Sequence, residues 1–97
     1  MDDDLRFEWD PNKAKGNLTK HGVSFEEAAT VFYYEPAKIE DDPDHSIGER
    51  RELIFGRSAA GRFLLVSFTE RGDSIRIIHA RQATKSERRK YEEDLIS

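Results

Sequence analysis

The sequence predicts a small α+β domain whose elements follow the order β-α-α-β-β-β-β-α. Three observations support this fold class. Two helix starts lie close together near the N-terminus, three β-branched and aromatic runs separated by short turns fill the second half, and another helix start precedes the C-terminus. Consecutive strands joined by short turns form antiparallel hairpins, so we expect an antiparallel sheet with two N-terminal helices and one C-terminal helix.

The chain of 97 residues is expected to form one domain over residues 1–97, with residues 1–4 disordered. A chain of this length buries about 60–65% of its unfolded surface, enough for one modest core. Without cysteine, disulfides and thiolate metal sites are excluded, and the three histidines show no metal-ligand spacing, so we expect neither a metal site nor a cofactor. No apolar run could span a membrane and no signal-peptide pattern occurs, which predicts a cytoplasmic protein.

Local signals define the first strand and helix. Apolar and charged residues alternate over residues 5–10, as on a strand with one buried face. Asp10 can cap a helix that begins at Pro11, and Gly22 is expected to end it. We predict an apolar face on this helix and, beside it, a polar stripe at i, i+4 and i+7 spacing. The apolar face comprises Ala14, Leu18 and His21, and the stripe comprises Lys13, Asn17 and Lys20.

A second helix is predicted to follow directly, before a short strand. Ser24 and Glu27 match a capping box, and Pro36 bounds the helix on its C-terminal side. A brief strand around Ile39 then leads into an acidic loop that carries Pro43.

The second half is predicted to be a β-meander followed by the last helix. Its strands cover the runs "RRELIFGRS", "GRFLLVSFTE" and "DSIRIIHARQ", which the turns "AAG" and "RGD" separate. Thr84 and Glu87 match a second capping box, and the helix that they start runs toward Ile96.

Charge is segregated along the chain, although the net charge is −4. Residues 35–49 contain six acidic residues and a single lysine, whereas residues 50–90 contain eleven Lys or Arg and four Asp or Glu, a balance of +7. A basic half of this kind favours an anionic partner such as nucleic acid, and ordinary solvation of a protein surface is the alternative interpretation.

Candidate chemistry rests on cations and histidines, because no P-loop, Gly-rich dinucleotide turn or nucleophile elbow occurs. His79 and Arg81 lie two apart on a predicted strand, on the face that strict alternation also gives to Ile77. A charged residue that continues an apolar face requires a partner. Arg81 therefore either serves a site or pairs with a carboxylate of the first strand or the last helix. His79 and His21 are either site residues or packed structural histidines.

Four sequence blocks occur in a specific order and together span most of the chain: W-D-P-x-K, K-H-G-V-S-F-E-E-A, R-I-I-x-A-R and E-R-x-x-Y. They resemble the BrnT family, the toxins of type II toxin–antitoxin systems. The resemblance implies a RelE-like fold and a metal-independent endoribonuclease that arrests translation. It also implies a BrnA antitoxin with a ribbon-helix-helix domain, through which the complex binds operator DNA. His79 occupies a position where the family commonly has serine.

Metal-free RNA cleavage requires a base for the 2′-OH, an acid for the 5′-oxygen and cations that stabilise the phosphorane. Arginine suits the last role because its planar guanidinium can donate two parallel hydrogen bonds to two phosphate oxygens. We predict Arg50, Arg71 and Arg81 as transition-state cations, His21 or His79 as general acid or base, and Tyr91 as a lesser candidate for proton transfer. The predicted RNA-binding cations are Lys13, Lys20, Arg51 and Arg76.

A second hypothesis is a non-catalytic protein-interaction domain that acts as an antitoxin-bound co-repressor of its operon. The same arginines would then form an interface with an acidic partner, since arginine is enriched at such interfaces. The two hypotheses differ in whether the chain cleaves RNA without its partner. Direct DNA binding is not favoured, because the sequence has no helix-turn-helix signal and a net charge of −4.

Overall fold

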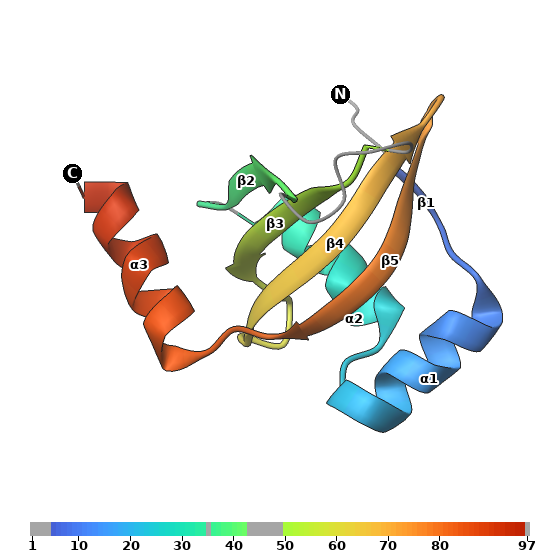
Figure 1. Ribbon diagram of the computed structural model, residues 1–97, viewed down its shortest axis with the longest axis horizontal. Coiled ribbons are helices and arrows are strands. Elements are labelled where there is room, and N and C mark those ends of the chain that lie inside the picture. The colour runs from blue at the N-terminus through green and yellow to red at the C-terminus, as the bar shows by residue number, and fades with distance from the viewer. Residues whose placement is uncertain (1–4, 35, 43–49, 97) are drawn as a thin grey trace.

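The computed structural model describes residues 5–34, 36–42 and 50–96, and its elements follow the predicted order (Figure 1). The strands are β1 (Arg6–Glu8), β2 (Lys38–Asp41), β3 (Glu52–Arg57), β4 (Phe63–Arg71) and β5 (Ser74–Gln82). The helices are α1 (Pro11–His21), α2 (Phe25–Thr30) and α3 (Lys85–Ile96), and a 3-10 turn, η1, covers Val31–Tyr33. The α+β class is thereby confirmed. The predicted disorder at residues 1–4 and the acidic loop around Pro43 lie outside the described residues.

The strands of the described residues form one sheet in the order β1-β5-β4-β3-β2. The pairs β2–β3, β3–β4 and β4–β5 are antiparallel, as predicted, whereas β1 lies parallel to β5 at one edge. A parallel pair needs a long connection between its strands, and here the helices and the other strands provide it. The sheet is therefore antiparallel except at this edge.

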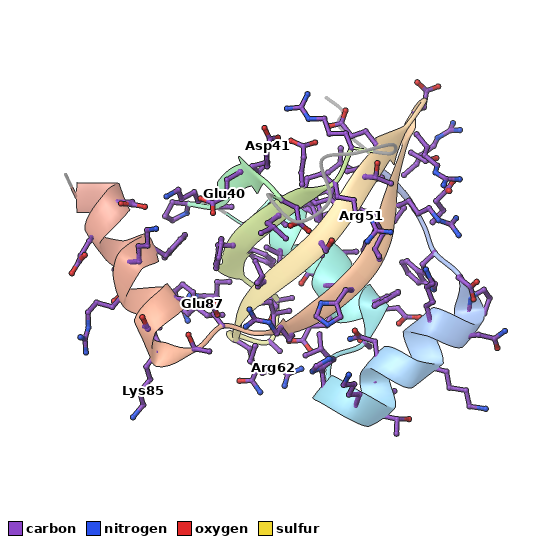
Figure 2. The ribbon with its side chains drawn as sticks, in the orientation of Figure 1. Glu40, Asp41, Arg51, Arg62, Lys85 and Glu87 are labelled. Atoms are coloured by element: carbon purple, nitrogen blue, oxygen red, sulfur yellow. The ribbon has the colours of Figure 1, made fainter. Side chains whose placement is uncertain are left out.

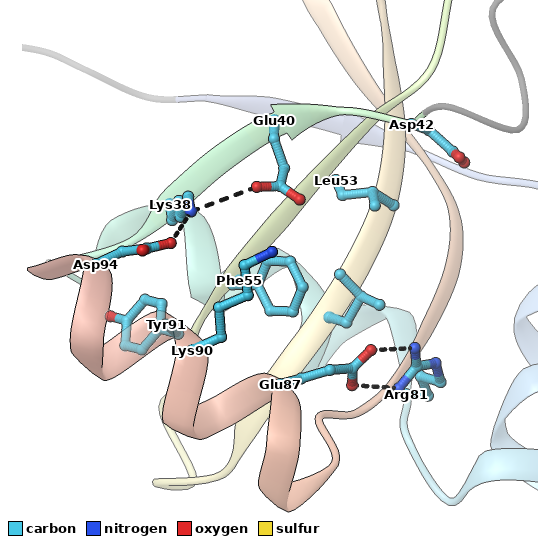
Figure 3. A pocket seen from close by; sticks show the side chains of 11 residues that line it. Lys38, Glu40, Asp42, Leu53, Phe55, Arg81, Glu87, Lys90, Tyr91 and Asp94 are labelled. Carbon is cyan, nitrogen blue, oxygen red and sulfur yellow. Dashed lines mark hydrogen bonds and ion pairs between the residues drawn. The ribbon is translucent and has the colours of Figure 1, made fainter.

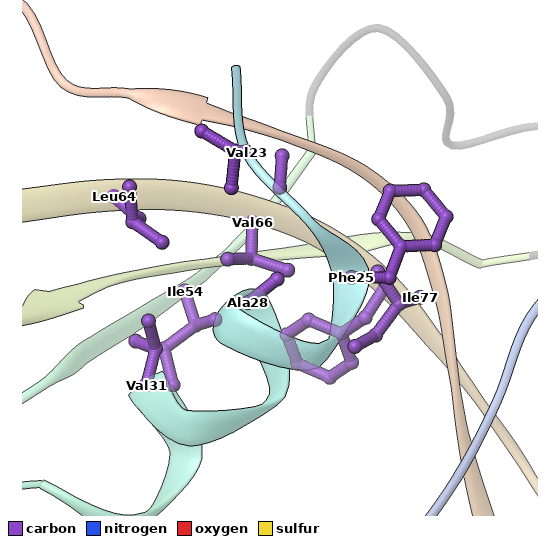
Figure 4. Close-up of a cluster of buried hydrophobic side chains, with 10 residues drawn as sticks. Val23, Phe25, Ala28, Val31, Ile54, Leu64, Val66 and Ile77 are labelled. Atoms are coloured by element: carbon purple, nitrogen blue, oxygen red, sulfur yellow. The ribbon is translucent and has the colours of Figure 1, made fainter. Parts of the chain in front are cut away.

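One face of the sheet carries the hydrophobic core, which α2 and η1 cover (Figures 1 and 4). Phe25 and Ala28 of α2 and Val31 of η1 are fully buried there. The sheet contributes Ile54, Leu64, Val66, Phe68, Ile77 and Ala80 to this cluster. Gly56 permits the close approach of η1, because a Cβ at this position would lie 3.0 Å from Val31 Cγ1.

The predicted caps begin the three helices. The side chain of Asp10 accepts hydrogen bonds from the first turn of α1, and Ser24 does the same for α2. Thr84 and Glu87 form a complete capping box, with reciprocal hydrogen bonds of 2.8 and 3.1 Å between backbone N–H groups and side-chain oxygens. The second helix is divided, because α2 ends at Thr30 and continues as η1.

The predicted faces of α1 are wrong at two positions. Leu18, predicted to face the core, is 53% exposed, whereas Asn17, predicted to lie in the polar stripe, is buried. The Asn17 amide donates to Val23 O at 2.9 Å and to Ala80 O at 2.8 Å, and its Oδ1 accepts from the Ala80 N–H at 3.2 Å. Ala80 lies on β5 beyond the end of β1, so this side chain pairs with backbone groups that lack a neighbouring strand there.

The predicted alternation along β5 is also wrong. Ile77 and His79 pair with adjacent residues of β4, so the intervening Ile78 forms a bulge. As a result, Ile77 and Ala80 both enter the core. His79 and Arg81 lie on the opposite face of the sheet instead of continuing the face of Ile77.

Candidate functional site

The face of the sheet opposite the core, called here the second face, carries the site. Two rows of side chains cross β3, β4 and β5 on this face. The first row is Leu53, Ser67 and His79, and the second is Phe55, Leu65 and Arg81. Arg51, a predicted RNA-binding residue two positions before Leu53, follows the same alternation and is half-buried (Figure 2). The bulge in β5 is what brings His79 and Arg81 to this face.

His79 meets His21, the last residue of α1, at the edge of the second face. Their Nε2 atoms lie 3.1 Å apart, and the two rings cross at 84°. In a neutral pair one Nε2 must carry hydrogen while the other accepts it, so a single proton lies between the facing nitrogens. Gly22, with φ of 70°, ends α1 directly after His21, and Asn17 holds the helix against β5. These local features fix the geometry of the pair.

The electrostatic surroundings keep the His79 ring neutral. Burial lowers the pKa of His79 from its usual 6.5, and the nearby positive charges of His21, Arg81 and Lys20 lower it further. A neutral imidazole at pH 7 can accept a proton, which is the property that a general base needs. The structure therefore gathers three of the predicted residues, His21, Arg81 and Lys20, around a fourth, His79, which can take up a proton.

Arg81 is paired with the last helix, one of the two alternatives that the sequence left open. Its guanidinium donates two hydrogen bonds of 2.8 Å to the Glu87 carboxylate (Figure 3). The hydrogen bond from Arg81 is the main reason why the pKa of Glu87 falls to about 2. Glu87 thus accepts the hydrogen bonds that the Arg81 guanidinium was predicted to donate to phosphate. The charge of Arg81 still acts on His79.

A pocket of about 330 Å³ lies between α3 and the second face, next to this ion pair (Figure 3). Its floor is apolar and consists of Leu53, Phe55 and Leu65. Its rim is charged and comprises Lys38, Glu40, Asp42, Arg81, Glu87, Lys90 and Asp94. The pocket can therefore accept an apolar group whose surroundings are polar.

Tyr91 lines the same pocket from α3. Its ring is buried and packs edge-on against Phe63 with a centroid distance of 5.3 Å, and its hydroxyl donates a hydrogen bond to the Pro36 carbonyl. Burial raises the pKa of this hydroxyl. In this arrangement Tyr91 docks α3, together with an ion pair between Lys38 and Asp94.

The remaining predicted arginines lie toward the β4–β5 hairpin, away from the histidines. Arg50 pairs with Asp41 at 2.8 Å, and Arg76 pairs with Glu8 at 2.9 Å. Arg71 is the last residue of β4 and lies six residues beyond Leu65, which pairs with Arg81. Six residues of strand correspond to about 20 Å. The three predicted transition-state arginines are thus not brought to one point.

The predicted lysines lie on the exposed side of α1. Lys13 and Lys20 are both exposed. Lys20 comes near enough to the histidine pair for its charge to act on His79. In the part of the chain that the structure describes, no three His, Asp or Glu side chains form a group that could hold a metal ion.

Sequence reasoning missed two functions at the site. Asn17 was placed on the surface, although an asparagine inside a helix is unfavourable and could have suggested a buried hydrogen-bonding role. Glu87 was assigned only to the capping box, whereas it also binds Arg81. A carboxylate of the last helix was one expected partner of Arg81, but no sequence signal singles out Glu87.

Comparisons with known proteins agree with this architecture. The chain matches the family model described as the ribonuclease toxin BrnT of type II toxin–antitoxin systems over residues 9–87. It also resembles the crystal structure of the Brucella abortus ribonuclease toxin BrnT, with a TM-score of 0.62 and 20% identity over 84% of this chain and 100% of that chain. No curated protein matches, and no described helix is long and apolar enough to cross a membrane. Because the family model covers most of the sequence, the chain belongs to the BrnT family of ribonuclease toxins of type II toxin–antitoxin systems.

Proposed function

We propose that this chain is a metal-independent endoribonuclease, that it acts in the cytoplasm to arrest translation, and that a BrnA-type ribbon-helix-helix antitoxin neutralises it. Membership of the ribonuclease toxin family supports RNA cleavage and an antitoxin partner. The observation that carries the proposal is the His21–His79 pair, with Nε2 atoms 3.1 Å apart beside the charges of Lys20 and Arg81. These side chains supply both proton transfer and positive charge, which metal-free cleavage requires.

His79 acts as the general base in this proposal. Its lowered pKa keeps the ring neutral at pH 7, so Nε2 accepts the 2′-OH proton once RNA displaces the contact with His21. The 2′-oxygen attacks phosphorus, and the P–O5′ bond breaks. A protonated His21 gives its proton to the departing 5′-oxygen. The products are a 2′,3′-cyclic phosphate and a 5′-hydroxyl.

The cations have separate roles. Because the Arg81 guanidinium already donates two hydrogen bonds to Glu87, Arg81 acts through its charge on His79 and does not bind the phosphate directly. Lys20 lies beside the pair and stabilises the phosphorane, while Lys13 and Arg51 bind the RNA backbone on either side. Three further arginines lie toward the β4–β5 hairpin and extend this contact along the sheet: Arg50, Arg71 and Arg76.

The test is cleavage of a structured RNA by the purified chain in EDTA, without antitoxin. Wild type should cleave, and His79→Ala and His21→Ala should each slow cleavage by about 10²–10⁴-fold, the usual contribution of general acid–base catalysis. Lys85→Ala is the matched control, because Lys85 is exposed and points away from the sheet at the start of α3 (Figure 2). Wild-type rates in both folded histidine variants would refute the assignment.

The pocket favours a second candidate function, a non-catalytic interaction domain that acts as an antitoxin-bound co-repressor. Its floor of Leu53, Phe55 and Leu65 suits an apolar side chain of a protein partner. Operator DNA would then be contacted only through the antitoxin. A folded wild type that cleaves neither free RNA nor RNA on translating ribosomes would support this candidate, whereas cleavage only on ribosomes would support a ribosome-dependent nuclease.

A further inference from the structure

Besides proton transfer, the two facing nitrogens of the histidine pair have the chemistry to bind a metal ion. The two Nε2 atoms face each other at 3.1 Å, from rings that cross at 84°. Zinc binds imidazole nitrogen at about 2.0–2.1 Å, so two imidazole nitrogens on one tetrahedral zinc ion lie about 3.3 Å apart. The 3.1 Å separation in the pair is about 0.2 Å shorter than that value, so a small opening of the pair lets both nitrogens bind one ion.

We propose that His21 and His79 form a two-histidine site for a divalent transition-metal ion, with Zn²⁺ as the reference ion, and that occupancy inhibits RNA cleavage. Water molecules or a phosphate oxygen would complete the coordination. The inhibition rests on the proposed function, because the ion takes the two nitrogens that would otherwise move protons. The binding itself does not depend on that function.

Some charged groups around the histidine pair favour metal binding and others oppose it. A metal ion binds neutral imidazole, and the lowered pKa of His79 means that protons compete weakly for it at pH 7. Lys20 and Arg81 repel a cation, but Glu87 offsets the charge of Arg81 through two hydrogen bonds of 2.8 Å. Lys20 is exposed, so solvent and salt screen it. With two protein ligands the site is weaker than a structural zinc site, which suits reversible inhibition.

The proton balance of binding follows from the pair itself. In the neutral pair one Nε2 carries hydrogen, and this nitrogen must lose it before it can bind the ion. The same ring then takes a proton at Nδ1 from solvent, so the neutral pair binds Zn²⁺ without net proton release. A singly protonated pair releases one proton when it binds the ion, so binding should weaken as the pH falls and protons compete for the two nitrogens.

Binding is measured with zinc sulfate on the full chain, by competition with a chromogenic chelator. Wild type should bind one Zn²⁺ per chain. His79→Ser, which introduces the residue common in the family, and His21→Gln should each weaken binding by at least about tenfold. His45→Asn, which changes the remaining histidine of the sequence, is the matched control and should bind like wild type.

Equal Zn²⁺ affinity in wild type and His79→Ser, or a loss of binding confined to His45→Asn, would overturn the site. If the variants do not fold, the imidazole ¹H–¹⁵N spectrum of wild type decides, because Zn²⁺ should shift the ring signals of His21 and His79 and not those of His45. In the RNA assay repeated without EDTA, saturating Zn²⁺ should slow wild type and His45→Asn by at least about tenfold. Bound zinc with undiminished cleavage would overturn the inhibition. The chelator assay needs no cleavage, so failure of the proposed function leaves it interpretable.

Discussion

At the scale of single residues, the proposed chemistry depends on a neutral His79. Burial is the largest cause that lowers its pKa, and the charges of His21, Arg81 and Lys20 lower it further. Histidine NMR titration should therefore place the His79 pKa below 6.5, the usual value. Lys20→Gln should raise this pKa because it removes one positive charge, whereas Lys85→Gln should leave it unchanged. A His79 that titrates above 6.5 would contradict this environment.

The same shift predicts how His79 affects stability. The unfolded chain binds the His79 proton more readily than the folded chain, so the contribution of this residue is fully present above pH 6.5 and is lost as the pH falls through the folded pKa. Replacing His79 with Ser should make the unfolding free energy less dependent on pH in this window. Urea unfolding at successive pH values would measure the change.

Asn17 should be the most sensitive polar position of α1. Its amide makes three hydrogen bonds, one to the Val23 carbonyl and two to the backbone of Ala80. Asn17→Ala would leave these buried groups without a partner, so we expect a loss of about 3 kcal/mol of unfolding free energy. Asn12→Ala, on the exposed first turn of the same helix, should change stability by less than about 0.5 kcal/mol. Equal effects in urea unfolding would contradict the role of Asn17 as a substitute strand partner.

At the scale of elements, two glycines should respond in opposite directions to alanine. Gly56 on β3 faces η1, and a Cβ there would lie 3.0 Å from Val31 Cγ1 and 3.2 Å from Ala37 Cβ. Gly56→Ala should therefore destabilise the protein by about 1–3 kcal/mol. Gly16 lies inside α1, and a methyl group at this position would meet no neighbouring element within 4 Å, so Gly16→Ala should stabilise by about 0.5–1 kcal/mol. Thermal unfolding of both variants tests this expectation, and melting temperatures that shift in the same direction in both variants would contradict it.

Polar and aromatic contacts attach the described side chains of the C-terminal helix α3 to the rest of the domain. Arg81 pairs with Glu87 near its start, and the Tyr91 hydroxyl donates to Pro36 farther along. The guanidinium of Arg88 also lies 4.3 Å from the centroid of the Phe63 ring. The helix therefore lies beside the sheet and leaves the pocket between them, as Figure 3 shows.

At the scale of the whole molecule, two carboxylates join segments that are distant in sequence. Glu27 of α2 binds Arg62 before β4 at 2.5 Å, and Glu87 of α3 binds Arg81 of β5 at 2.8 Å. The hydrogen bond from Arg62 is the main cause that lowers the pKa of Glu27, and that from Arg81 brings the pKa of Glu87 to about 2. Both folded pKa values lie below the usual 4.5, so their stabilisation is present above pH 4.5 and is lost as the pH falls toward 2.

This linkage predicts acid sensitivity that single substitutions can locate. The unfolding free energy from urea titrations should decrease between about pH 5 and about pH 2. Glu27→Gln should cost about 2 kcal/mol at pH 7 and flatten part of this dependence, because it removes a charge-assisted hydrogen bond. Glu26→Gln, at the exposed neighbouring position, should leave the profile unchanged. An identical pH profile in wild type and Glu27→Gln would contradict the assignment.

The elements were predictable because their signals are local. Asp10 and Ser24 cap the helices that follow them, and alternating apolar runs form the strands of the meander. The site was predictable only in part, since it depends on contacts between distant residues. His21 and His79 are 58 positions apart, and the bulge at Ile78, which sets the face of His79, leaves no trace in the alternation of the sequence.

The most direct measurement for the central claim is the chemical identity of the RNA ends that the purified chain produces in EDTA. Attack by the 2′-oxygen, with His79 as base and His21 as acid, predicts a 2′,3′-cyclic phosphate on one fragment and a 5′-hydroxyl on the other. A 2′-deoxy substitution at the cleavage site should abolish the reaction. Fragments with 5′-phosphate ends, or cleavage that persists at the 2′-deoxy position, would contradict the account.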